Sequence, residues 1–162
     1  MSVNLLLGIV IGALVVVRVM GRQLRGSMVT QRSLVVVPLV LVVIGLASAR
    51  GEFDTASAGE LAFFVFDVAV LILIGFARGA STQLSTRDGG LHQKGTATTL
   101  TLWLLTIGIR VGAGFAGAAM GLNGSLTTAA LLLTFGLSIA AQNVAVYLRA
   151  QRLRIPFAVE RA

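Results

Sequence analysis

The sequence contains no cysteine and a single histidine, His92, among its 162 residues. Without cysteine the chain has no disulfide framework, no thiolate nucleophile and no thiolate ligand for a metal. One histidine also excludes a histidine-rich zinc or copper site and the ligation of haem by two histidines of the same chain. We therefore expect no metal and no cofactor.

Charge is also scarce, because only 12% of the residues are charged while 56% are hydrophobic and the mean hydropathy is +0.93. An ordinary globular domain has about a quarter of its residues charged. A chain of this composition cannot hide its apolar side chains by folding in water, so we expect an integral membrane protein. No Pro-rich or Ser-rich linker divides the chain, so residues 1–162 are predicted to form a single transmembrane domain.

Five apolar runs are long enough, or nearly so, to cross a hydrocarbon layer of about 30 Å as helices. They cover residues 3–20, 34–49, 59–77, 96–120 and 126–148. The predicted fold class is an all-α membrane protein, a bundle of five transmembrane helices. Pro38 near the start of the second run is tolerated in a membrane helix with a modest bend. Trp103 and Tyr147 are expected to anchor the helices at the headgroup level.

The formal net charge is +7, and the basic residues gather in alternate connections. The first connection, the third connection and the tail together hold eleven Lys and Arg, with Arg78 counted in the third, whereas the other connections hold only Arg50. The positive-inside rule then places the N-terminus outside and the C-terminus in the cytoplasm. Basic residues beside membrane segments favour anionic lipid as a partner, and nucleic acid is not expected. The residues expected to bind this lipid are Arg22, Arg25, Arg149, Arg152 and Arg154.

A polar segment, residues 81–95, separates the third and fourth apolar runs. It contains Asp88-Gly89 with Leu84 and Leu91 on either side, which predicts a short cytoplasmic β-hairpin turned at that dipeptide. His92 is expected to be a solvated surface residue of this hairpin rather than a base. The candidate residues of the hairpin surface are Arg87, Asp88, Gly89, His92 and Lys94.

The third run, the segment from Thr86 to Gly95 and a fourth run with Arg110 near its middle together resemble the CcdC-like family of small bacterial membrane proteins. The resemblance covers most of the chain in layout, and the hairpin and Arg110 in residue detail. It implies a multi-pass protein of the bacterial inner membrane. The family takes its name from cytochrome c biogenesis and has no established activity, so the resemblance implies no mechanism. Because this chain lacks cysteine, direct thiol chemistry is excluded.

Asp67 and Arg110 lie in the middle of the third and fourth runs. A charge at mid-membrane costs about 2.5–3.5 kcal/mol even on insertion scales, so each needs a partner. We expect the two residues to form an ion pair that joins their helices. The alternatives are a substrate or proton site, and separate partners in a water-filled cavity.

Thr134, Ser138 and Gln142 recur at every fourth residue of the fifth run, with Asn143 beside them. This spacing places their polar groups on one helix face, where they can bond to neighbouring helices or line a polar pathway near Arg110. Gly8 and Gly12 in the first run, and Gly108 and Gly112 in the fourth, have the spacing that allows helices to approach closely, either within the bundle or between two copies.

These patterns predict a membrane protein without catalytic activity, an accessory or assembly partner whose cytoplasmic face contacts another membrane protein or anionic lipid. The alternative is a small oligomeric permease or channel that uses Asp67 and Arg110. A membrane enzyme is the third and least supported hypothesis, because the sequence shows no nucleophile with an adjacent base and no carboxylate pair.

Overall fold

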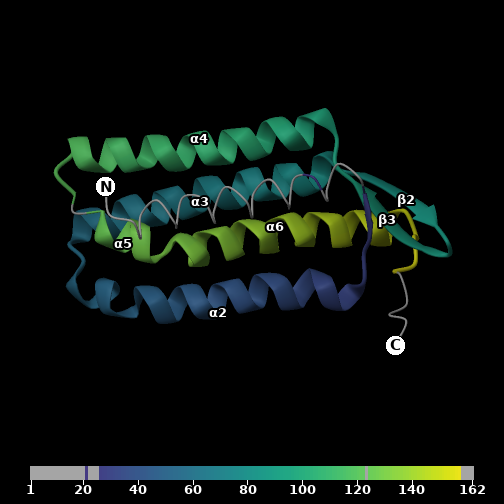
Figure 1. Ribbon diagram of the computed structural model, residues 1–162, viewed down its shortest axis with the longest axis horizontal. Helices are drawn as coiled ribbons and strands as arrows, with labels where there is room; N and C mark the ends of the chain where they lie inside the picture. The colour runs from purple at the N-terminus through teal and green to yellow at the C-terminus, as the bar shows by residue number, and fades with distance from the viewer. Residues whose placement is uncertain (1–20, 22–25, 123, 158–162) are drawn as a thin grey trace.

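The computed structural model describes residues 21, 26–122 and 124–157. Within them, four helices are long and apolar enough to cross a membrane: α2 (Gln31–Thr55), α3 (Ala58–Ser81), α4 (Ala97–Ala119) and α6 (Leu131–Arg152) (Figure 1). The prediction of a helical membrane protein is thus confirmed for these four helices. The first predicted span, residues 3–20, and the glycine pair Gly8 and Gly12 lie outside the described residues.

The distribution of side chains over the bundle is that of a protein surrounded by lipid. Large apolar side chains such as Leu73 and Phe115 are 70% and 75% exposed, whereas Asp67 and Arg78 are 3% and 0% exposed. Water would favour the opposite arrangement, because polar groups would then be solvated and apolar groups buried. These polar residues therefore lie inside the bundle, while many large apolar side chains of the helices lie on its surface.

Local capping explains where two of the helices begin. Ser57 and Glu60 form a reciprocal capping box before α3, and Thr96 and Thr99 form another before α4, so free amides of each first turn have acceptors. The helix α2 begins and ends beyond the predicted run 34–49, with Thr30 as its N-cap. Arg50 therefore belongs to α2 rather than to a connection.

The predicted fifth span, residues 126–148, is wrong as a single helix. It consists of a short helix α5 (Ser125–Ala129) and the longer α6, which are separated at Ala130. In an uninterrupted helix the Thr127 carbonyl would accept from the amide four residues later. Here it accepts a hydrogen bond of 3.2 Å from Arg110 Nη2 instead. The break thus provides a main-chain acceptor for the guanidinium of Arg110.

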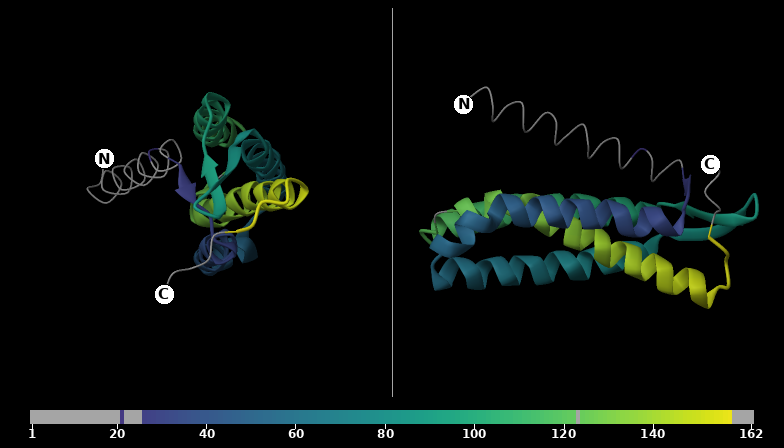
Figure 2. Two further views of the ribbon diagram at one scale, coloured as in Figure 1. Left: turned by 90° about the vertical axis from the view of Figure 1, so that its right-hand side faces the viewer. Right: turned by 90° about the horizontal axis from the view of Figure 1, so that it is seen from below.

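Helix α6 packs between α2 and α3, and α4 packs against α3 (Figure 2). Glycines set this packing. A Cβ on Gly75 would lie 2.2 Å from the Ser138 carbonyl oxygen, and one on Gly79 would lie 2.2 Å from that of Gln142. A Cβ on Gly45 of α2 would lie 2.1 Å from the Leu133 amide nitrogen. These contacts bring the backbones of α3 and α2 directly against α6.

The sequence pointed to different glycines for close packing. In the described part of the chain, a Cβ on Gly108 or Gly112 would meet nothing within 4 Å, so the prediction that they pack within the bundle is wrong there. Both residues lie on an exposed face of α4. Their contact with a second copy stays a prediction.

The predicted hairpin is confirmed. The strands β2 (Gln83–Arg87) and β3 (Gly90–Lys94) pair in an antiparallel register and project beyond one end of the bundle (Figure 1). Asp88 and Gly89 have positive φ values of 48° and 75°, as expected for the two-residue turn. A third strand, β1 (Ser27–Met28), pairs with the other side of β3 and was not predicted.

An apolar cluster attaches this sheet to the helices. Its buried members include Leu91 of β3, Leu34 of α2 and Val146 of α6. Tyr147 packs against the cluster and stacks on Phe157 with ring centroids 5.6 Å apart. The sheet is therefore held against the ends of α2 and α6, at what we call the sheet end of the bundle.

Candidate functional site

Buried polar side chains meet where α3, α4 and α6 face one another. We call this set the polar seam. Its members are Asp67, Arg78, Thr106, Arg110, Thr134, Ser138 and Gln142.

The ion pair expected from the sequence is present in the seam. Arg110 of α4 donates from Nη1 to Asp67 Oδ2 of α3, and the two side chains are 15% and 2% exposed. Arg110 also donates to Thr127, so one guanidinium joins α3, α4 and α5. Oδ1 of Asp67 is buried and has no hydrogen-bond partner among the described residues. The pair therefore leaves one strong acceptor unused.

Two residues of the seam, Arg78 and Thr106, were not predicted from the sequence, and Arg78 is the charged one. It was counted as a cation of the cytoplasmic connection, but it lies in the last turn of α3 and is completely buried. Its position eleven residues after Asp67 corresponds to three helical turns, about 16 Å, so both side chains lie on the same face of α3. That spacing was the signal available in the sequence.

The guanidinium of Arg78 is enclosed by neutral groups. It donates from Nε to Gln142 Oε1, from Nη1 to Thr106 Oγ1 at 3.4 Å, and from Nη2 to Ser138 Oγ at 3.2 Å. Its central carbon lies 3.9 Å from the ring centroid of Trp103, in a cation–π contact. No carboxylate contacts Arg78 in the part of the chain that the structure describes. The seam thus holds two cations and one carboxylate.

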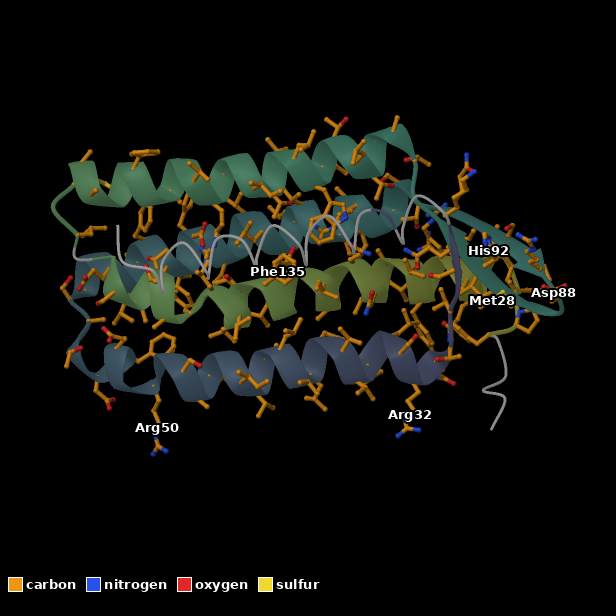
Figure 3. All side chains as sticks on the ribbon, viewed as in Figure 1. Met28, Arg32, Arg50, Asp88, His92 and Phe135 are labelled. Atoms are coloured by element: carbon orange, nitrogen blue, oxygen red, sulfur yellow. The ribbon has the colours of Figure 1, made fainter. Side chains whose placement is uncertain are left out.

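Trp103 is part of this arrangement and not a headgroup anchor as predicted. It is 2% exposed and also contacts Phe135 of α6, with ring centroids 5.7 Å apart. Figure 3 shows Phe135 in the centre of the bundle, while Arg32 and Arg50 point away from it. The aromatic contact fills the space between α4 and α6.

The three polar residues on α6 are all buried, as the spacing predicted, but they bond differently. Gln142 accepts from Arg78, and Ser138 donates to the Leu71 carbonyl of α3 at 3.0 Å. Thr134 donates to the Leu131 carbonyl of its own helix at 3.0 Å. The expected interhelical bonding is therefore made by two of the three residues.

Asn143 completes a second contact of α6, on its side toward α2. Its side-chain amide donates to the Leu34 carbonyl at 2.8 Å. This carbonyl would normally pair with the amide of residue 38, which is a proline and has none. Asn143 supplies the donor that Pro38 lacks.

The hairpin candidates lie away from the seam, on the sheet. Arg87, Asp88, Gly89 and Lys94 are exposed, and Asp88 lies at the tip of the hairpin (Figure 3). His92 is half-buried rather than solvated. Its ring packs against Gly26, where an added Cβ would lie 2.4 Å from the His92 Cε1. The structure does not bring these residues together with Asp67 or Arg110.

Two small cavities adjoin the seam at opposite ends. One of about 240 Å³ is lined by Trp103, Gln142 and Asn143 at the sheet end. The other, of about 220 Å³, is lined by Glu60 and Thr127 at the far end. Among the described residues no group of three or more His, Asp or Glu side chains could hold a metal ion.

No protein-family model matches the chain, and neither a curated protein nor a solved structure does.

Proposed function

We propose that this chain is a noncatalytic accessory or assembly protein of the bacterial inner membrane. The observation that supports the proposal best is that the interior polar groups bond the helices to one another. Arg110 joins three helices, Arg78 contacts α4 and α6, and Ser138 bonds to α3. Interior charges used in this way stabilise a scaffold.

The close backbone contacts at Gly75 and Gly79 support the same role, because α3 and α6 touch directly at these two positions and a solute could not pass between them there. A scaffold of this kind acts through its surface. Two surfaces are available for a partner: the polar face of the sheet, and the exposed face of α4 that carries Gly108 and Gly112.

Site-specific photo-cross-linking in cells tests the proposal. A photoreactive residue at Ser85 on the sheet or at Gly112 on α4 should give one discrete protein adduct, identifiable by mass spectrometry. The control position is Val40 of α2, which is exposed and apolar. If Ser85 and Gly112 give only the diffuse products seen at Val40, the accessory role is wrong.

The second candidate is a small oligomeric permease or channel. Arg78 lacks a contacting carboxylate among the described residues, and the seam has a cavity at each end, which together favour passage of a small anion. The protein reconstituted in vesicles should then carry chloride, nitrate or phosphate, and Arg78→Gln should abolish that flux. Vesicles no leakier than protein-free ones would exclude this candidate.

The orientation and the family are parts of the same proposal. When the buried Arg78 is left out of the count made from the sequence, ten basic residues remain on one side against Arg50 alone on the other, wherever the helix ends lie, which supports a cytoplasmic sheet end. The likeness to the CcdC-like family, carried by the hairpin and Arg110, supports a bacterial inner-membrane location.

A further inference from the structure

A basic pocket lies at the sheet end, between β2 and the ends of α3 and α6. Its volume is about 700 Å³, and its lining includes four residues that carry or can carry positive charge: Arg87, His92, Lys94 and Arg149. No Asp or Glu of the described residues lines it. It is separate from the polar seam, which shares no residue with it.

The register of the hairpin gathers these cations. Gln83 pairs with Lys94, Ser85 with His92 and Arg87 with Gly90. Cross-strand partners and alternate residues share a face of a sheet, so Arg87, His92 and Lys94 lie on one face. Leu84 and Leu91 lie on the other, toward the apolar cluster.

Arg149 is held in place at the pocket by the end of α3. Its Nη1 donates to the Gly79 carbonyl at 3.1 Å and to the Thr82 carbonyl at 2.7 Å. Within the described residues, its Nε and Nη2 make no hydrogen bond, so those donors are available to a ligand. A guanidinium fixed in this way loses little conformational freedom when it binds an anion.

The pocket also opens onto an apolar surface. Ala80 lines it, and the same exposed side of α3 continues through Phe76 and Leu73, which are 45% and 70% exposed. These residues are spaced at three and four positions, so they form a continuous stripe along the helix. A ligand in the pocket can therefore extend an apolar chain along α3.

We propose that this pocket binds the phosphate headgroup of an anionic phospholipid, with one acyl chain lying along Leu73 and Phe76. Phosphate oxygens accept hydrogen bonds from Arg149 and from the cations of the hairpin, which is the chemistry of headgroup pockets near membrane surfaces. The apolar stripe favours a lipid over soluble phosphate. The lipid thus binds in one defined pocket, and not over the broad basic surface that the sequence predicted.

The test measures binding of the first lipid to detergent-solubilised protein by native mass spectrometry, using phosphatidylglycerol and phosphatidylcholine with identical acyl chains. The double variant Arg87→Gln/Lys94→Gln should bind phosphatidylglycerol more than tenfold more weakly, since each cation near an anionic headgroup accounts for about fivefold. Binding of phosphatidylcholine should not change. Arg149 is left intact because it also holds the end of α3.

The matched control is Arg152→Gln/Arg154→Gln, which removes two exposed cations at the same end that do not line the pocket. It should retain affinity within about twofold. Equal weakening in both double variants would show general attraction and overturn the pocket, as would no weakening in either. Displacement of the lipid by inorganic phosphate, but not by chloride of equal ionic strength, would overturn the lipid in favour of a soluble anion.

Discussion

The side-chain amide of Asn143 donates to the main-chain carbonyl of Leu34, the acceptor that Pro38 leaves without its helical partner. The polar residue on α6 thus compensates for the amide that the proline in α2 lacks. In lipid an unpaired carbonyl has no water to bond with. The bond from Asn143 therefore both satisfies the Leu34 carbonyl and links α6 to α2.

Replacing Asn143 by Leu should destabilise the protein by about 1–3 kcal/mol, because the Leu34 carbonyl would be left unpaired. Replacing Pro38 by Ala restores the missing amide, so the cost of Asn143→Leu should be smaller in that background. Unfolding in mixed micelles, followed by helical ellipticity, measures both values. Equal losses in the two backgrounds would show that Asn143 acts by other contacts.

Glycine substitutions should separate the packed helices from the free face of α4. Gly75→Ala places a Cβ 2.2 Å from the Ser138 carbonyl oxygen, so it should cost about 1–3 kcal/mol through overpacking. Gly112→Ala meets nothing within 4 Å in the described chain and should be neutral, or stabilising by up to about 1 kcal/mol. The same unfolding measurement compares the two. A larger loss at Gly112 would place a partner against α4.

Arg78 and Trp103 give an optical test, since Trp103 is the only tryptophan of the chain. Its emission should be that of a buried indole with little quenching by iodide. Arg78→Gln should change the emission and lower stability, because Gln142, Thr106 and Ser138 lose their shared donor. Arg78→Lys keeps the charge but not the planar fork, so it should recover only part of the loss. If Arg78→Gln leaves both emission and stability unchanged, the buried cation has no packing role.

Cysteine labelling tests the orientation, because the natural chain has no cysteine background. Thr55 and Ser125 lie at the end of the bundle opposite the hairpin, which carries Ser85 (Figure 1). An impermeant thiol reagent on intact cells should label Thr55→Cys and Ser125→Cys but not Ser85→Cys. Labelling at Ser85 alone would invert the orientation.

The features that the sequence predicted well are those with a local or strongly constrained signal. The hairpin follows from Asp88-Gly89 between apolar residues, and the Asp67–Arg110 pair follows from the cost of two mid-membrane charges. Both conclusions require few assumptions about how the helices are arranged.

The features that were missed depend on that arrangement. Arg78 lies near a helix end, where a basic residue normally reaches water, and only its packing beneath Trp103 shows that it is buried. The break at Ala130 lies in a segment, residues 125–135, that contains no proline or glycine, and it coincides with a hydrogen bond from another helix. Likewise β1 is two residues long and exists only because β3 offers an edge.

The central claim is that the interior charges hold the bundle together. Asp67 and Arg110 test this claim. Removing one partner of a buried ion pair typically costs about 3–5 kcal/mol, whereas removing both charges can be nearly neutral. Asp67→Asn and Arg110→Gln should each lower the free energy of unfolding. The double variant should recover a good part of the loss, but not all of it, since the bond to Thr127 also disappears.

The decisive measurement is the coupling free energy from this double-mutant cycle, obtained by reversible unfolding in mixed micelles. We expect a coupling of more than about 1 kcal/mol, with the double variant more stable than the sum of the single losses predicts. Strictly additive losses, together with an anion flux that Asp67→Asn or Arg110→Gln abolishes, would contradict the scaffold and assign the charges to passage of a solute.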